Sequence, residues 1–82
     1  MIVSVYTLKK PTFFRTAQSV NLKTAMGEIT ILKNHRPYLT FLRKGDVRIV
    51  DKSGKIETIK ASEGLVEVLP GSRVNIFLRQ SF

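Results

Sequence analysis

The amino-acid sequence predicts a small all-β protein, an antiparallel β-sandwich of about ten short strands. Apolar residues recur at alternate positions in several short segments, which is typical of strands with one buried face. Turn-forming residues interrupt these segments every five to twelve residues, and no window has a sustained period of 3.6 residues. Short strands separated by regular turns indicate a sandwich or a barrel.

The first four expected strands precede the only histidine. Residues 2–8 are rich in β-branched side chains, and Pro11 ends this segment because proline has no amide hydrogen to donate. Residues 12–15 contain two adjacent phenylalanines, whose side chains must point to opposite faces of a strand. Residues 19–24 alternate clearly between apolar and polar, and residues 28–32 resume this alternation after a short turn.

Five further strands are expected after Pro37, which brings the number that the residues themselves indicate to nine. The pattern predicts them at residues 38–42, 47–50, 56–61, 65–69 and 73–78. Glycine-containing turns separate them, because glycine readily adopts the positive φ that tight turns need. In the last strand, Val74, Ile76 and Leu78 form the expected core face, and Phe77 lies on the opposite face.

Length and composition allow a single domain over residues 1–82 with one hydrophobic core, since 43% of the residues are apolar. The sequence contains no cysteine, which excludes disulfides and thiolate metal sites. No apolar run approaches the roughly 20 residues of a membrane span. The N-terminus also lacks the basic flank of a signal peptide.

The charge is strongly basic, with 14 Lys and Arg against six Asp and Glu, a net charge of +8. Such a charge attracts nucleic acid, anionic lipid or an acidic protein. The alternative function is therefore a small basic β-fold that binds single-stranded nucleic acid by stacking bases on exposed aromatic rings. The candidate residues would be Phe13, Phe14, Tyr38 and Phe41 beside Lys9, Lys10, Arg15, Arg36 and Arg43.

Catalysis is not expected. His35 is the only histidine, and the six carboxylates show no spacing that would pair a general acid with a base. Glu57 and Glu67 occupy strand positions that are expected to face solvent. No glycine-rich loop opens a helix, so no phosphate-binding motif is present. The sequence thus predicts no catalytic residue, no bound metal and no cofactor.

An ordered series of motifs resembles a known family. The motifs are Val20-Asn21-Leu22, Gly27-Glu28-Ile29-Thr30-Ile31-Leu32, Asn34-His35-x-Pro37 and Leu42-x-x-Gly45-x-Val47-x-Ile49. They resemble the epsilon subunit of F-type ATP synthases, in which the run reads G-E-x-G-I-L-x-x-H-x-P followed by L-x-x-G-x-x-x-I. Leu65-Val66-Glu67-Val68 resembles that family's G-F-x-E-V strand, and residues 74–78 resemble its V-T-V-L strand.

This resemblance implies a ten-stranded sandwich and a non-catalytic subunit of the central rotor stalk. Such a subunit binds the gamma subunit and the c-ring, and it couples proton flow through the ring to ATP synthesis. It lies peripherally on the cytoplasmic (or matrix or stromal) side of the membrane and needs neither a small-molecule substrate nor nucleic acid. The implied contact surface for ring and gamma comprises Glu28, Thr30, Lys33, Asn34, His35, Arg36 and Pro37. Glu28 would pair with basic groups on the ring's polar loops.

The sequence departs from the family pattern at three places. Thr30 replaces a glycine, and Glu63 replaces the first glycine of a Gly-Gly pair. The family continues beyond the position of Phe82 into two helices that carry nucleotide binding and inhibition of ATP hydrolysis in many members. The 82-residue sequence is therefore expected to do neither by that route. The charge of +8 would face anionic lipid or acidic parts of other subunits.

Overall fold

The computed structural model describes residues 1–8 and 13–79, and this part of the chain forms nine strands. Their bounds are β1 Ile2–Tyr6, β2 Phe13–Thr16, β3 Ser19–Thr24, β4 Gly27–Leu32, β5 Tyr38–Leu42, β6 Gly45–Val50, β7 Ile56–Ala61, β8 Gly64–Leu69 and β9 Arg73–Leu78. The predicted all-β fold is confirmed, and four of the nine strands have the predicted bounds. The expected turn at Lys9-Lys10-Pro11 lies outside the described residues.

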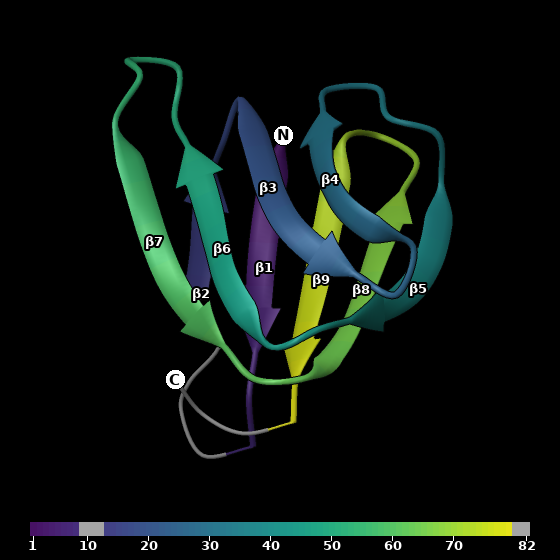
Figure 1. Ribbon diagram of the computed structural model, residues 1–82. Helices are drawn as coiled ribbons and strands as arrows, with labels where there is room; N and C mark the ends of the chain where they lie inside the picture. The colour runs from purple at the N-terminus through teal and green to yellow at the C-terminus, as the bar shows by residue number, and fades with distance from the viewer. Residues whose placement is uncertain (9–12, 80–82) are drawn as a thin grey trace.

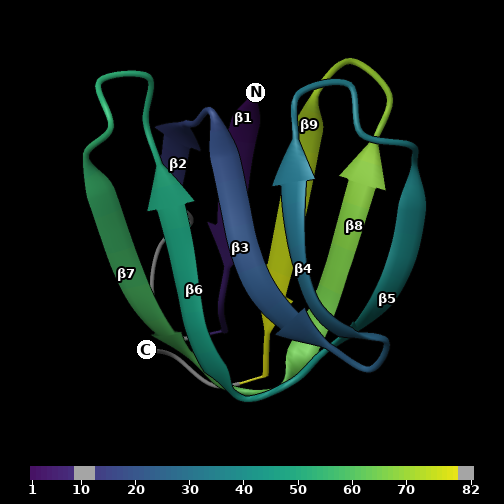
Figure 2. The ribbon, with the colours of Figure 1, turned by 45° about the horizontal axis from the view of Figure 1, so that its top comes forward.

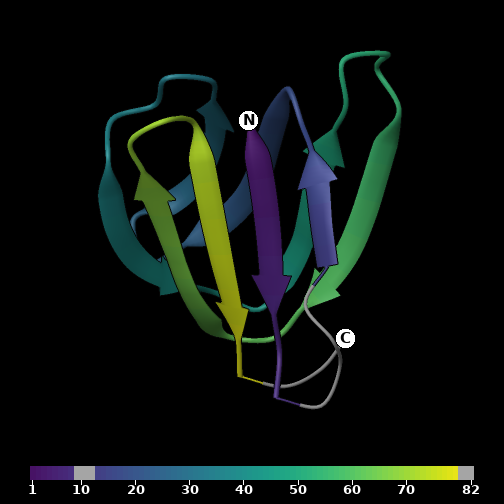
Figure 3. The same ribbon diagram turned by 180° about the vertical axis from the view of Figure 1, so that it is seen from behind.

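The strands form one curled sheet that folds into two layers (Figures 1 and 2). The order along the sheet is β2-β1-β9-β8-β5-β3-β6-β7, with β4 added to β3. One layer contains β2, β1, β9, β8 and β5 (Figure 3), and the other contains β4, β3, β6 and β7. A single residue pair, Thr24 with Leu42, joins β3 to β5 where the sheet turns from one layer to the other. All pairings are antiparallel except β1 with β9, which is parallel.

The core lies between the two layers and consists of the apolar residues at alternate strand positions. Val74, Ile76 and Leu78, predicted to face inward on β9, are all buried, and so are the alternating apolar residues of β3, Val20 and Leu22. The buried apolar residues are Val3, Val5, Ala17, Val20, Leu22, Ile31, Leu42, Val47, Ile49, Ile59, Ala61, Val66, Val68, Val74, Ile76 and Leu78. Burial of each larger member contributes about 1.5–3 kcal/mol, so alternation in the sequence dictates which face of each strand turns inward.

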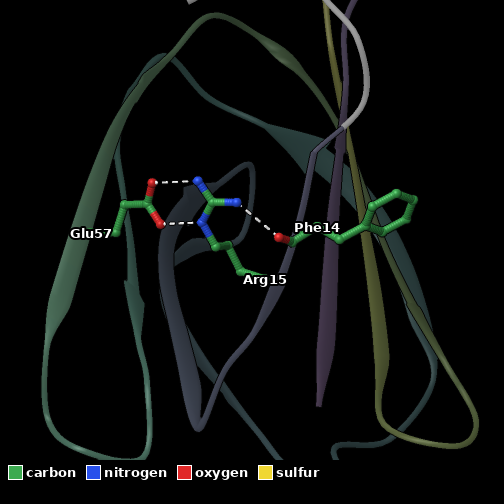
Figure 4. Close-up of polar contacts among 3 residues, drawn as sticks. All are labelled: Phe14, Arg15 and Glu57. Carbon is green, nitrogen blue, oxygen red and sulfur yellow. Dashed lines mark hydrogen bonds and ion pairs between the residues drawn. The ribbon is translucent and has the colours of Figure 1, made fainter.

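Two edge strands, β2 and β7, are bridged by an ion pair between the layers (Figure 4). The guanidinium of Arg15 donates to Glu57 through Nε to Oε1 at 2.6 Å and through Nη2 to Oε2 at 3.1 Å. Its Nη1 also donates to the backbone oxygen of Phe14 at 2.9 Å. The hydrogen bond with Glu57 raises the pKa of Arg15. Glu57 was expected to face solvent, and its side chain is 41% exposed, but it also pairs with Arg15 of the other layer.

Candidate functional site

The seven residues of the predicted contact surface fall at two ends of the sandwich. Glu28 follows the β3–β4 turn, whereas Lys33 begins the loop that connects β4 to β5. Strand β4 runs between them, and a rise of about 3.3 Å per residue separates Glu28 from Lys33 by about 16 Å. The two groups lie at opposite ends of the molecule in Figure 1. The structure therefore does not assemble the seven residues into one patch.

Glu28 and Thr30 belong to a polar network on the outer surface of β3, β4 and β6. Asn21 stands at its centre, with Nδ2 donating to Thr30 Oγ1 at 2.9 Å and to Glu28 Oε2 at 3.3 Å. Arg48 Nη2 donates to Asn21 Oδ1 at 2.9 Å and lies 3.8 Å from Glu28 Oε2. Thr30, which replaces a family glycine, thus points outward and accepts a hydrogen bond. The Glu28 carboxylate is half exposed, so it can still contact a partner.

The turn beside Glu28 is held from the core side. The buried hydroxyl of Thr24 donates to the Gly27 oxygen at 2.8 Å and accepts from the Met26 amide at 3.1 Å. Gly27 has φ +109°, a conformation that only glycine adopts without strain. The Met26 side chain is 81% exposed at the tip of this turn. Glu28 therefore follows a turn that hydrogen bonds from Thr24 hold in place, and the exposed Met26 side chain lies at the tip of that turn.

Lys33–Pro37 form a loop that packs against the turn between β8 and β9. Asn34 has φ +65°, and its amide donates to Ser72 Oγ at 3.3 Å. Ser72 Oγ also lies 3.4 Å from Asn34 Oδ1, and the His35 amide donates to the Leu32 oxygen at 3.1 Å. Asparagine tolerates the left-handed conformation better than most residues, which explains its place at this bend. The loop has one defined shape, and the Lys33 and Arg36 side chains project from it into solvent.

His35 is supported by an aromatic neighbour. Its ring centroid lies 5.9 Å from that of Tyr38, with the planes inclined by 34°. Burial raises the pKa of the Tyr38 phenol, and a hydrogen bond with Thr24 partly offsets this shift. Tyr38 is half-buried and packs on the core. His35 is therefore a loop residue resting on a core tyrosine, with no carboxylate held against it among the described residues.

An exposed apolar row, which the motif analysis missed, crosses the outside of the other layer. Phe41 of β5 pairs with Leu65 of β8, Leu65 pairs with Phe77 of β9, and Phe77 pairs with Tyr6 of β1. The Tyr6 and Phe77 rings stack, with centroids 4.9 Å apart and planes inclined by 12°. We call these four residues the apolar row.

A further exposed apolar residue lies beside the apolar row. Leu39, also on β5, is 63% exposed, and Phe41 is 69% exposed. Exposed apolar residues gathered on one face of a sheet are typical of surfaces that bind other proteins. The signal in the sequence is that 38–42 and 64–69 carry large apolar residues on both faces of the strand, a pattern of strands covered on both sides.

The aromatic cluster of the nucleic-acid alternative does not assemble in the described residues. Phe14 lies on β2 and Phe41 on β5, at the two ends of one layer with three strands between them. At about 4.8 Å per strand they are about 19 Å apart. Tyr38 packs inward, and Arg15 is paired with Glu57. Lys9, Lys10 and the Phe13 side chain lie outside the described part.

Within residues 1–8 and 13–79, no group of three or more His, Asp or Glu side chains gathers in a way that could hold a metal ion. The same residues contain no helix of the length and apolar character that crossing a membrane requires. These residues present to solvent an apolar face, the half-exposed carboxylate of Glu28 and many cations.

Comparison with known proteins identifies relatives of this fold. The sequence profile of the ATP synthase delta/epsilon chain β-sandwich domain matches residues 1–81. A chain in the Euglena gracilis mitochondrial ATP synthase, from a structure of OSCP, F1 and c-ring, superposes with a TM-score of 0.83 at 19% identity. That match covers 93% of this chain and 48% of the Euglena chain.

A second match lies in the central stalk and c-ring of the Tetrahymena thermophila mitochondrial ATP synthase. Its TM-score is 0.76 at 18% identity, and it covers 96% of this chain and 63% of that one. The 82-residue chain thus spans about half of the first relative and less than two thirds of the second. These structural matches establish the shared fold, and the profile match confirms the family predicted from the ordered motifs.

Proposed function

The chain belongs to the family of ATP synthase delta/epsilon chain β-sandwich domains, and we propose that it is a non-catalytic subunit of the central stalk. In this role it joins the gamma subunit to the c-ring and couples proton flow to ATP synthesis. It is peripheral to the membrane, through the ring, on the side that carries the catalytic head. The observation that carries the proposal is the profile match over residues 1–81.

The apolar row is the proposed contact with gamma. It runs across four strands of a rigid layer, so docking a partner there orders few flexible groups and carries little entropic cost. Phe41 of the apolar row and the neighbouring Leu39 are the most exposed apolar residues of β5 and would enter the centre of the interface.

Glu28 is the proposed contact with the ring. Its carboxylate lies beside the β3–β4 turn, and its distance from Arg48, 3.8 Å, leaves oxygen atoms available to a basic group on a partner. Because the loop 33–37 is at the opposite end, a sandwich that meets the ring through Glu28 directs that loop away from it. Pro37 lies two residues before Leu39, and we propose that Lys33–Pro37 border the gamma contact.

A co-purification experiment tests the gamma contact. Gamma from the same organism is co-expressed with the chain, and Phe41→Glu is compared with Ile56→Glu, an exposed apolar residue of the other layer. Phe41→Glu should reduce retained gamma by at least about tenfold, since it places a charge in an apolar interface. Ile56→Glu should retain gamma. Equal retention by both variants would contradict the assignment.

A coupling experiment tests the ring contact. Glu28→Lys is compared with Glu63→Lys, because each glutamate lies 3.8 Å from one arginine of this chain. Proton-driven ATP synthesis by membranes that contain the assembled enzyme should fall with Glu28→Lys and persist with Glu63→Lys. Unchanged synthesis with Glu28→Lys would show that this carboxylate is only solvated.

A further inference from the structure

We propose that one end of the sandwich, which lies away from Glu28 and borders the gamma contact only through its loop 33–37, binds an acidic polypeptide segment. This end consists of Met1 and the turns at 17–18, 33–37, 51–55 and 70–72, and we call it the loop end. Strand register brings these turns together, because Ser19 pairs with both Leu32 and Val50. Figures 1 and 3 show them at the same end as the N-terminus.

The loop end holds an excess of positive charge that the chain does not neutralise. Five cations form no close ion pair among the described residues, although Lys55 lies near enough to Asp51 to contribute to the lowering of its pKa: Lys33, Arg36, Lys52, Lys55 and Arg73. Asp51 is the only carboxylate of the turns, which hold four Lys and Arg. With Arg73, the first residue of β9, the local balance is five minus one, or +4, half of the +8 given by the Lys, Arg, Asp and Glu of the chain. The nearby Arg15 and Glu57 neutralise each other.

Asp51 is committed to its own turn. Its Oδ1 accepts hydrogen bonds from Ser53 Oγ at 2.6 Å, from the Ser53 amide at 2.9 Å and from the Lys55 amide at 3.0 Å. These bonds, with that of the Ser53 hydroxyl foremost, lower the pKa of the Asp51 carboxyl. The turn is thereby fixed, and Lys52 at its tip is held toward solvent.

A hollow between these turns gives the charge a concave shape. It has a volume of about 550 Å³, and Lys33 and Lys52 both line it, together with Gln18, Met1 and Asp51, whose Oδ1 accepts hydrogen bonds from its own turn. The Met1 amino group donates to the Ala17 oxygen at 2.9 Å, which fixes the N-terminus at its rim. A glutamate or aspartate side chain entering the hollow would meet two ammonium groups and an amide donor. Arg36 of the loop 33–37 and Arg73 at the start of β9 lie at the same end and can pair with further carboxylates in bidentate geometry.

An acidic polypeptide fits this end better than nucleic acid or a membrane. Base stacking needs exposed rings, and the aromatic rings among the described residues here are those of His35 and Tyr38, which contact each other and are half-buried. Surface attachment to a bilayer combines charge with inserted apolar groups. The exposed apolar residues nearest this end, Ile2, Leu32 and Ile56, lie on strands rather than on its turns, and Met26 lies at the other end. An acidic polypeptide has a flexible backbone, so its carboxylates can reach the lysines in the hollow and the arginines at its rim.

Binding to a fluorescent octaglutamate peptide tests the proposal with the full 82-residue chain. The variant Lys33→Glu with Lys52→Glu is compared with Lys23→Glu with Lys44→Glu, which changes the net charge equally at the opposite end. An exposed ion pair contributes at most a few-fold to affinity. The loop-end variant loses two ion pairs with the peptide and places two carboxylates that repel it, so its binding should weaken about tenfold. Binding of the control variant should weaken less than about threefold. Binding should also weaken between about 50 and about 200 mM salt, because exposed charges are screened.

Three results would overturn the proposal. Equal weakening by both variants would mean that the attraction belongs to the net charge rather than to the loop end. Tighter binding of an oligothymidine or of anionic phospholipid vesicles would assign the end to those ligands. No binding of octaglutamate at the lowest salt would also refute it. Thermal melting verifies that both variants fold. If the Lys33→Glu, Lys52→Glu variant does not fold, Lys33→Gln with Lys52→Gln replaces it and should weaken binding by a smaller factor. The outcome does not depend on gamma or the ring, so it is independent of the stalk function.

Discussion

Gly64 is the position at which a single methyl group should damage the fold most. It begins β8, pairs with Leu42 on one side and with Leu78 on the other, and so has neighbouring strands on both edges. A Cβ at this position would lie 1.9 Å from the Phe77 backbone oxygen and 3.2 Å from the Leu78 Cα. Because these atoms belong to the backbone of β9, no side-chain rotation relieves the clash.

The structure gives a magnitude for Gly64→Ala. Real Cβ atoms are almost never closer than about 3.0 Å to such atoms, so β9 must move by more than about 1 Å. Overpacking typically costs about 1–3 kcal/mol, and a backbone obstacle places this substitution at the upper limit. In a domain of this size each kcal/mol lowers the melting temperature by about 4–8 °C. We expect a loss of about 12–24 °C.

Thermal unfolding followed by circular dichroism measures this effect. The matched control is Gly54→Ala, where φ is +90° and nothing lies within 4 Å of the added carbon. The control should lose about 1–2 kcal/mol from backbone strain alone. If Gly64→Ala melts within about 4 °C of the parent chain, or no lower than Gly54→Ala, the close approach of β8 and β9 is refuted.

Two further predictions concern polar contacts. Asp51→Asn should lower the free energy of unfolding at pH values above the ordinary aspartate pKa of about 3.9. The difference in stability between the variant and the parent should vanish as the pH falls through the lower pKa of Asp51 in the folded chain, because a depressed pKa contributes stability only while the group is ionised. Chemical unfolding at pH values between about 2 and about 7 measures this difference, and a difference that stays constant with pH would contradict the prediction. A double-mutant cycle of Arg15→Ala and Glu57→Ala should give a coupling free energy of about 0.5–1 kcal/mol, since the ion pair is bidentate but exposed. A coupling of zero would show that this ion pair between β2 and β7 does not stabilise the fold.

The sequence was sufficient to predict the strands and the core but not the arrangement of the surface. The bounds of 19–24, 38–42, 56–61 and 73–78 were predicted correctly, because alternation and the turn residues between strands are local features of the sequence. The apolar row depends on the register of four strands that are distant in sequence, and one of its pairings, β1 with β9, is parallel. No local pattern specifies such pairings.

The candidate site was harder to predict for a related reason. Glu28 and His35 are close in the sequence, but β4 extends between them and carries them to opposite ends. Asn21 and Arg48, which hold Glu28, come from other strands and become visible only once the register is known. The substitutions at Thr30 and Glu63 are accommodated because both side chains point outward, whereas the glycine retained at Gly64 is required by its close neighbour.

The stalk function is tested most directly by purifying the ATP synthase of the source cells through a tag on its beta subunit and analysing the active enzyme by mass spectrometry. The proposed function predicts peptides of this chain in constant ratio to gamma through the final purification step. An enzyme that couples proton flow to ATP synthesis and contains no trace of this chain would contradict it.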